Sequence, residues 1–267
     1  MSDCLTPTPP ARPVAPYLGG KRALARRIIE RIAAIPHTTY VEPFVGMGGV
    51  FFRRPFRARA EVVNDINQDV ATLFRVLQRH YQALMDMLRW QLTSRAEFDR
   101  LLAAVPDTLT DLERAARFLY LQRAGFGGKV DGRSFGVSVA HPARFDVTKL
   151  AAILESAHDR LAGVVIERLP WPALLDRYDR PETLFYLDPP YWGCEADYGP
   201  GIFAQADFEQ LSAHLGRLKG HWLLSLNDVP PVRKLFRPFH QQRVQVSYGI
   251  GTVTGSTAPR GELIISP

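Results

Sequence analysis

The residues best suited to chemistry form the tetrapeptide Asp188-Pro189-Pro190-Tyr191, which directly follows an apolar run at 184–187. The apolar run predicts a short buried strand, and the prolines end it because proline cannot donate to a sheet ladder. In open α/β sheets, ligands bind at the carboxyl ends of strands. Asp188 is therefore expected to anchor a polar ligand at such an end.

This arrangement suits a reaction at the exocyclic amine of a nucleobase. The lone pair of that nitrogen is delocalised into the ring, and two acceptors aimed at its hydrogens release it for attack on an electrophile. The Asp188 carboxylate and the Pro189 carbonyl are two such acceptors. Tyr191 and Trp192 offer aromatic faces, and stacking contributes roughly 1–3 kcal/mol per base. The alternative is a plain strand-ending turn with the aromatic residues in the core.

A second motif, with the sequence YLGGK, runs from Tyr17 to Lys21 and precedes an expected helix at 22–35. A Gly19-Gly20 turn at the start of a helix lets backbone N–H groups face a carboxylate or a phosphate. Lys21 adds a positive charge there, and Tyr17 can lie against the cationic or aromatic part of a cofactor. The alternative is an ordinary loop with a solvated lysine.

A third motif lies between two expected strands at 39–44 and 61–65 and reads EPFVGMGG over Glu42–Gly49. Its glycines permit a tight turn and a close backbone approach to a ligand. It is not the complete G-x-G-x-x-G fingerprint of a dinucleotide site. Asp65 follows Gly48 by 17 residues, and in nucleotide-binding α/β folds an acidic residue at about this spacing binds a ribose hydroxyl.

The middle of the chain has a different character. Residues 81–124 are expected to be mostly helical, and a loop with five glycines follows at 125–136. Long loops are usually functional or disordered. Cationic side chains in and around this loop could contact phosphates or base edges, or could simply keep a mobile surface loop solvated. These candidates for nucleic-acid binding are Arg123, Lys129, Arg133 and Arg144.

Strands and helices alternate in the C-terminal third, which predicts an α/β fold. Strands are expected at 163–167, 184–187 and 222–226, with a closing antiparallel pair at 244–248 and 262–266. Asn67 is a candidate cap for a helix at 68–80, and further helices are expected at 147–161, 171–178 and 207–218.

The composition indicates a globular protein with a polyanionic partner. Hydrophobic residues make up 46% of the chain, enough for a sizeable core, and the net charge of +6 favours nucleic acid. The two cysteines lack metal-ligand spacing, which fits a reducing cytoplasm and predicts no metal site. No apolar run is long enough to span a membrane. Residues 1–16 are rich in proline and are expected to be a disordered leader.

Together, the three motifs resemble those of the Dam-type DNA adenine-N6 methyltransferases, in the order of that family. The similarity covers most of the chain after residue 16. Its elements are YLGGK at 17–21, YVEPFVGMGG at 40–49 followed by NDIN at 64–67, and DPPY at 188–191. A recognition-sized insert separates the last two.

The resemblance implies a Rossmann-like methyltransferase fold of the α/β class. This fold has a seven-stranded mixed sheet, helices on both faces, one antiparallel hairpin edge and a mostly helical DNA-recognition insert. The catalytic domain would span 17–86 and 163–267, and the insert 87–162. The family implies S-adenosylmethionine as the methyl donor and an adenine flipped out of double-stranded DNA. We expect a cytoplasmic bacterial or phage protein that is a monomer or weak dimer.

The roles implied by the resemblance are assigned by position in this chain. Asp188, Pro189, Pro190 and Tyr191 would be catalytic. The cofactor would contact Tyr17, Gly19, Gly20, Lys21, Glu42, Pro43, Phe44, Gly46, Gly48, Asp65 and Asp188.

This chain departs from the family pattern after the strand at 163–167. Relatives often carry an Asp-Phe pair there that holds the cofactor adenine, whereas this chain has Arg168-Leu169-Pro170-Trp171. Trp171 is left as a candidate for stacking on the adenine. Two alternatives remain open at this point. One is an RNA or cytosine-N4 methyltransferase, and the other is a nucleic-acid-binding descendant that has lost catalysis.

Overall fold

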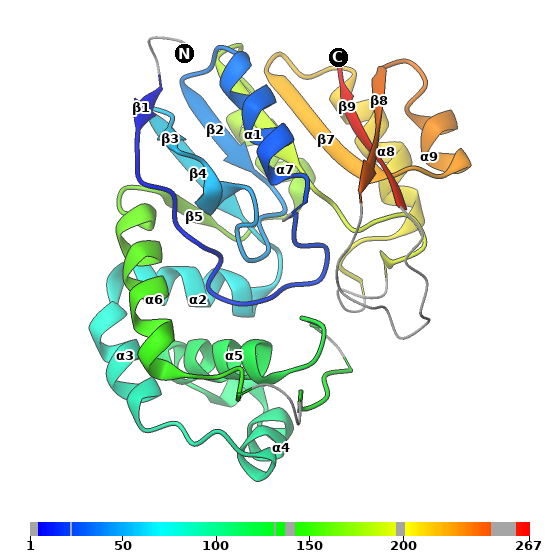
Figure 1. Ribbon diagram of the computed structural model, residues 1–267. Helices are drawn as coiled ribbons and strands as arrows, with labels where there is room; N and C mark the ends of the chain where they lie inside the picture. The colour runs from blue at the N-terminus through cyan, green and yellow to red at the C-terminus, as the bar shows by residue number, and fades with distance from the viewer. Residues whose placement is uncertain (1–4, 22, 131, 137–141, 196–200, 247–259) are drawn as a thin grey trace.

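The computed structural model describes residues 5–21, 23–130, 132–136, 142–195, 201–246 and 260–267. Its centre is a seven-stranded sheet with the strand order β5-β4-β2-β6-β7-β9-β8 (Figure 1). The first five of these strands are parallel, whereas β9 is antiparallel to both β7 and β8. The prediction of a mixed α/β sheet with an antiparallel edge is therefore confirmed.

The strands of the sheet are β2 (Thr39–Glu42), β4 (Ala60–Asn64), β5 (Val165–Glu167), β6 (Thr183–Leu187), β7 (His221–Asn227), β8 (His240–Val246) and β9 (Arg260–Ser266). The helices are α1 (Ala25–Ala34), α2 (Gln68–Arg79), α3 (Tyr81–Arg89), α4 (Arg95–Ala103), α5 (Asp111–Ala124), α6 (Val147–Leu161), α7 (Trp171–Tyr178), α8 (Gln205–Leu215) and α9 (Pro230–Leu235), with 3-10 turns η1 (Phe51–Arg53) and η2 (Pro106–Thr108). A separate small ladder joins β1 (Thr6–Pro7) to β3 (Phe56–Arg57).

The sheet order brings three predicted site residues together at the carboxyl ends of the strands. The chain runs outward from β2 to β4 and β5, then returns to β6 on the other side of β2. This reversal is a topological switch point, where α/β sheets open a crevice at the carboxyl ends of their strands. Glu42 ends β2, Asp65 follows β4 and Asp188 follows β6, so three carboxylates meet at this crevice.

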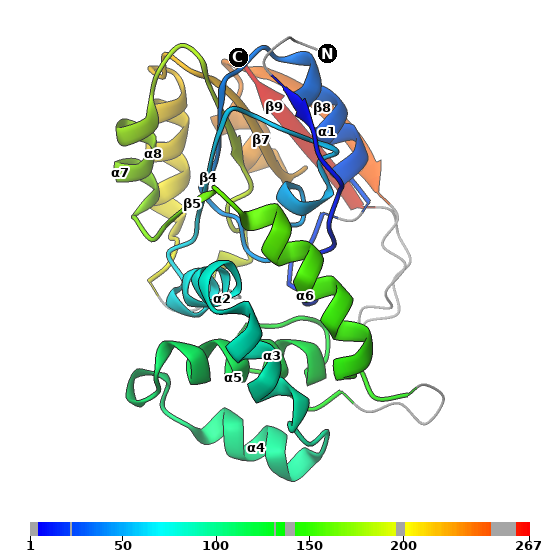
Figure 2. The same ribbon diagram turned by 90° about the vertical axis from the view of Figure 1, so that its left-hand side faces the viewer.

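Alternating side chains of the strands bury both faces of the sheet. In β6, Leu184 and Tyr186 belong to the core shared with α1, whereas Phe185 and Leu187 belong to the core shared with α7, α8 and α9. All four are at most 1% exposed. A period of two is what a strand requires when it is buried on both faces. Figure 2 shows α7 and α8 on one side of the sheet and α1 on the other.

Helices α3, α4, α5 and the far end of α6 form a helical lobe beside the sheet (Figures 1 and 2). The helices begin at the residues the sequence favours as caps. Asn67 accepts from the Asp69 N–H at the start of α2, as predicted, and Thr110 and Glu113 form a capping box at the start of α5. The loop after α5 leads back toward the sheet, so its residues can reach the crevice.

The prediction of a disordered leader is wrong for residues 5–16, the part of it that the structure describes. Leu5 is 7% exposed and Val14 is fully buried, and Thr6 pairs with Arg57 in the small ladder. Arg123 Nη1 donates to the Val14 carbonyl at 2.9 Å. Proline removes backbone donors, but it leaves carbonyl acceptors and apolar side chains available. Side-chain burial and hydrogen bonds to carbonyls therefore order this segment.

Candidate active site

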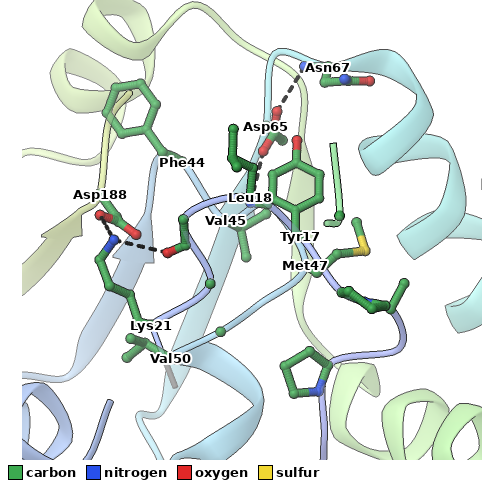
Figure 3. A pocket seen from close by; sticks show the side chains of 18 of the residues that line it. Tyr17, Leu18, Lys21, Phe44, Val45, Met47, Val50, Asp65, Asn67 and Asp188 are labelled. Carbon is green, nitrogen blue, oxygen red and sulfur yellow. Dashed lines mark hydrogen bonds and ion pairs between the residues drawn. The ribbon is translucent and has the colours of Figure 1, made fainter. Parts of the chain in front are cut away.

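A cavity of about 950 Å³ opens at the carboxyl ends of β2, β4 and β6. Figure 3 shows Lys21 and Asp188 on one side of it and Asp65, Asn67 and Tyr17 on the other. The predicted catalytic and cofactor-binding residues that line it are Tyr17, Gly19, Gly20, Lys21, Glu42, Phe44, Gly46, Asp65, Asp188 and Pro190. The predicted residues Pro43, Gly48, Pro189 and Tyr191 are not among the lining residues.

The Asp188 carboxylate is held by two side chains. Lys21 Nζ lies 2.7 Å from its Oδ1, and Ser225 Oγ donates to the same oxygen at 2.9 Å. Burial raises the pKa of Asp188, and the Lys21 ammonium and the Ser225 hydroxyl oppose this rise. Within the described residues both bonds go to Oδ1, which leaves Oδ2 to accept a hydrogen bond from a ligand. Asp188 is thus fixed in orientation but still available.

Lys21 joins Asp188 to Tyr191. Its ammonium lies 4.4 Å from the centroid of the Tyr191 ring and also donates to the Gly19 carbonyl at 3.1 Å. The Tyr191 hydroxyl donates to Glu262 Oε2 at 2.6 Å. One face of the Tyr191 ring therefore carries a cation, and its edge is anchored to β9.

Glu42 is a buried carboxylate in the wall of the cavity, with 2% of its surface exposed. It accepts a hydrogen bond from the Tyr40 hydroxyl at 2.7 Å. Burial raises its pKa to about 8, and the nearby Asp188 carboxylate adds to the rise, while the Tyr40 hydrogen bond and the Arg54 guanidinium oppose it. Glu42 is therefore poised to ionise when a cation binds beside it.

Tyr40 in turn contacts a buried ion cluster of Arg54, Glu61 and Arg160. Arg54 donates to Glu61 Oε1, and Arg160 donates to Glu61 Oε2 at 2.6 Å. The Arg54 guanidinium also lies 3.6 Å from the centroid of the Tyr40 ring. The cluster thus fixes the tyrosine that holds Glu42.

Asp65 is oriented by the backbone on both sides. Its Oδ2 accepts from the Gly46 N–H and its Oδ1 from the Asn67 N–H, each at 2.9 Å. Burial raises its pKa to about 6, and these two hydrogen bonds oppose the rise. Each carboxylate oxygen has two lone pairs, so both can still accept from a hydroxyl in the cavity.

The two predicted glycines of the third motif have different roles. Gly46 has a φ of +49°, and a Cβ there would lie 3.0 Å from the Tyr17 ring, so the residue shapes the cavity floor. Gly48 has a φ of +68°, and a Cβ there would lie 2.4 Å from the Phe52 side chain. Gly48 is therefore needed for packing against η1 rather than for contact with a ligand.

Two aromatic residues do not lie where the sequence suggested. Trp171 is 6% exposed, packs on the edge of His214 and donates to Asp207, so it does not face the cavity. Trp192 packs against Phe208 with 5.0 Å between ring centroids. Trp171 belongs to the hydrophobic core beneath α7 and α8, and Trp192 packs against the same core. The apolar wall of the cavity is instead formed by Phe44, Ile66 and Ile202.

The predicted cationic residues are only partly at the cavity. Arg123 and Arg144 line it, together with Phe126, whose ring lies 5.5 Å from the Arg144 guanidinium. Lys129 and Arg133 are not lining residues, and Arg133 donates to the Lys129 carbonyl at 3.1 Å. The loop after α5 thus supplies both an aromatic and a cationic group to the rim.

Sequence reasoning missed the residues that orient the tetrapeptide at 188–191. Ser225 sits in the middle of the buried strand β7, where it binds Asp188 and also lies 2.9 Å from the Tyr186 hydroxyl. Glu262 is 1% exposed in β9 and binds Tyr191. Their signal in the sequence was a polar residue inside an apolar strand, since buried polar groups require partners.

A cavity at the switch point of the sheet, lined by carboxylates such as Asp65 and Asp188, is typical of α/β proteins that bind a nucleotide-like ligand. The family model for D12 class N6 adenine-specific DNA methyltransferases matches residues 17–250. The chain belongs to this family. The match decides against the RNA and cytosine-N4 alternatives, and the chain is a DNA adenine-N6 methyltransferase by family.

Curated relatives agree with this assignment over nearly their whole lengths. The type II methyltransferase M.CviBI of Paramecium bursaria Chlorella virus NC1A is 22% identical over 89% of this chain and 91% of its own length. The type II methyltransferase M1.LlaDCHI of Lactococcus lactis subsp. cremoris is 23% identical over 96% and 95%. The retron Ec67 DNA adenine methylase of Escherichia coli is 24% identical over 93% and 88%.

Two further findings concern the described residues only. The described residues include no group of three or more histidine, cysteine or acidic side chains that could bind a metal ion. Every helix in this part of the chain is too short or too polar to cross a bilayer.

Proposed function

We propose that the cavity binds S-adenosylmethionine and receives an adenine flipped out of double-stranded DNA, whose N6 then takes the methyl group. The activated methyl group on the sulfonium of S-adenosylmethionine is the chemistry that the cofactor supplies. The protein supplies positioning and electrostatics, which account for most of the rate in such a direct displacement.

The residues of the cavity suit the parts of the cofactor. The volume of about 950 Å³ lies within the range of roughly 300–1,000 Å³ of small-molecule sites. Asp65 retains acceptor capacity for the ribose hydroxyls, and Phe44 with Ile66 offers an apolar wall for the adenine ring. Glu42 can accept from the ammonium group of the methionine part, and the raised pKa of this buried carboxyl falls when that cation arrives.

The target amine would bind between Asp188 and Pro189. Asp188 Oδ2 accepts one hydrogen of the amine, and the Pro189 carbonyl accepts the other, which turns the nitrogen lone pair out of the ring plane. As N6 forms its new bond to carbon it becomes acidic, and Asp188 is placed to take the proton. Lys21 and Ser225 favour the anionic form of the carboxylate that this role requires, against the rise in pKa that burial causes.

Tyr191 supports the flipped base by stacking. Tyr191 lies beside the lining residue Lys21, which occupies one face of its ring, so the adenine would use the other face. Extrusion of a base costs a few kcal/mol, which stacking and the hydrogen bonds of the pocket offset.

The remaining parts of the chain would bind the duplex. We propose residues 17–86 and 163–267 as the catalytic domain and 87–162 as the target-recognition insert. Arg123, Lys129, Arg133 and Arg144 lie in this insert and can contact phosphates or bases. Two relatives are named type II methyltransferases, which supports a partnership with a restriction enzyme.

The position of Asp188 beside the cavity, fixed through Oδ1 by Lys21 and Ser225, is the observation that carries this proposal. The test is to incubate the protein with S-adenosylmethionine and matched duplex and single-stranded DNA, digest the DNA and identify the modified nucleoside. We expect N6-methyladenine, formed faster in the duplex. A fluorescent base analogue at the target position should brighten on binding. Methyl transfer without any change in this fluorescence would contradict base flipping.

A further inference from the structure

We propose that the N-terminal segment 5–16, which precedes the part of the chain matched by the family model, is an arm of the DNA-binding surface in which Arg12 binds a backbone phosphate. The inference rests on the proposed function, because it requires a duplex at the mouth of the cavity. It adds a contact that lies outside the predicted recognition insert.

The segment is attached to both parts of the molecule. On the sheet side, the Ala11 N–H donates to the Phe52 carbonyl at 2.7 Å. On the helical side, Arg123 donates to the Val14 carbonyl at 2.9 Å, and Gln122 of α5 donates to the Pro16 carbonyl at 3.0 Å. Figure 1 shows the segment crossing between the sheet and the helical lobe. It is therefore a fixed wall of the site.

Gln122 also ties this wall to the loop after α5. Its Nε2 donates to the Gly128 carbonyl at 2.7 Å, and the Leu18 N–H donates to the same carbonyl at 2.9 Å. A Cβ at Gly128 would lie 2.9 Å from the backbone nitrogen of Tyr17, so only glycine permits this approach. The N-terminal segment, the cofactor motif and the glycine-rich loop thus form one continuous rim.

Within the described residues, the charged side chains of this rim that line the cavity are all cationic. Arg12, Arg53, Arg123 and Arg144 line the cavity, and the fully described residues of 5–16 include no acidic side chain. Arg12 is exposed, and within the described part of the chain no carboxylate pairs with it. The carboxylates that line the cavity, Glu42, Asp65 and Asp188, lie at the strand ends instead. An anionic partner would therefore meet the arginines first.

A DNA phosphate is the anion that fits this position. An adenine enters the cavity only while still attached to its backbone, so its flanking phosphates must come to the rim. The planar guanidinium of arginine matches a phosphate with two parallel hydrogen bonds. Each phosphate neutralised in duplex DNA releases condensed counterions and makes the logarithm of the affinity fall more steeply with salt, by about 0.9 per contact.

The experiment measures DNA affinity as a function of salt for three variants. Fluorescence anisotropy with a labelled duplex, in the presence of the reaction product S-adenosylhomocysteine, gives the Kd between about 50 and 200 mM KCl. Arg12→Ala removes the contact, and Arg12→Lys keeps the charge. Arg237→Ala is the matched control, since Arg237 is exposed beyond α9 and does not line the cavity.

We expect Arg12→Ala to bind more weakly and to reduce the salt slope by about 0.9, so that over this range the wild type loses about 3.5-fold more affinity than the variant does. Arg12→Lys and Arg237→Ala should keep the wild-type slope. An unchanged slope in Arg12→Ala would overturn the inference, as would an equal loss in the control.

Two further measurements separate this inference from the proposed function. The affinity of Arg12→Ala for S-adenosylmethionine alone should equal that of the wild type, and a tenfold loss would assign Arg12 to the cofactor site and overturn the inference. If the wild type forms N6-methyladenine in DNA while Arg12→Ala keeps the full slope, only the inference fails. If the wild type transfers no methyl group, the proposed function fails.

Discussion

Substitution of Glu42 by glutamine should stabilise the cofactor-free protein at neutral pH while weakening cofactor binding. The pKa of Glu42 is raised from 4.5 to about 8, mainly by burial. The native state therefore binds a proton that the unfolded state has released, and its stabilising effect is full below pH 4.5 and is lost as the pH rises toward 8. Glutamine has a similar shape and does not titrate.

The magnitude follows from the shift. One pKa unit corresponds to about 1.4 kcal/mol, so ionisation of Glu42 in the unfolded state costs the native protein about 3 kcal/mol at pH 7. Glu42→Gln should remove this loss. Urea unfolding of both proteins should show a stability difference in favour of the variant that grows by about 1.4 kcal/mol per pH unit between pH 5 and pH 8.

Cofactor binding should change in the opposite direction. Because the ammonium of S-adenosylmethionine favours the ionised carboxylate, binding at pH 7 should release a proton in the wild type and none at this position in Glu42→Gln. Calorimetry in buffers of different ionisation enthalpy counts these protons, and the variant should bind at least about tenfold more weakly. A stability difference that stays constant with pH, or equal proton release by both proteins, would refute this account of Glu42.

Other predictions concern the cavity floor, the ion pair and the buried cluster. Gly46→Ala places a side chain at a φ of +49° and against the Tyr17 ring, which should cost about 1–2 kcal/mol and reduce cofactor affinity in calorimetry; unchanged affinity would contradict this geometry. Lys21→Met removes the charge that lowers the pKa of Asp188, so the acidic limb of the pH–rate profile should move to higher pH, and an unmoved limb would argue against the pair. Glu61→Leu leaves two buried arginines without their carboxylate and should destabilise the protein by about 3–5 kcal/mol in urea unfolding, whereas a loss under about 1 kcal/mol would mean that the cluster is dispensable.

Local sequence patterns predicted most of the helices and strands, because these elements are determined largely by residues that are neighbours in the sequence. The continuous burial of β6, the Asn67 cap and the helix at 171–178 follow from the apolar pattern and the hydrogen-bonding capacity within a few residues. The ordered structure of residues 5–16 could not be predicted from such local patterns. It depends on Arg123 and Phe52, which are distant in sequence, and proline content gave no sign of these contacts.

In the candidate site, too, the sequence predicted the residues that local patterns reveal and missed the contacts between distant positions. Asp65 and Asp188 were found because each follows a strand, and the strand ends of a parallel sheet meet. The pair between Lys21 and Asp188 joins positions 167 residues apart, so no local pattern could reveal it. Trp171 was misplaced because its sequence position allowed either the cavity or the core, and packing against His214 decided for the core.

The most direct test of the account is methyl transfer by Asp188→Ala in a single turnover, with tritiated S-adenosylmethionine and duplex DNA. The variant should fold and bind the cofactor, yet its transfer rate should fall by about a hundredfold or more. Glu209→Ala, which removes an exposed carboxylate from α8, should keep the wild-type rate. A folded Asp188→Ala protein that methylates adenine at the wild-type rate would contradict the central claim that this carboxylate activates the amine.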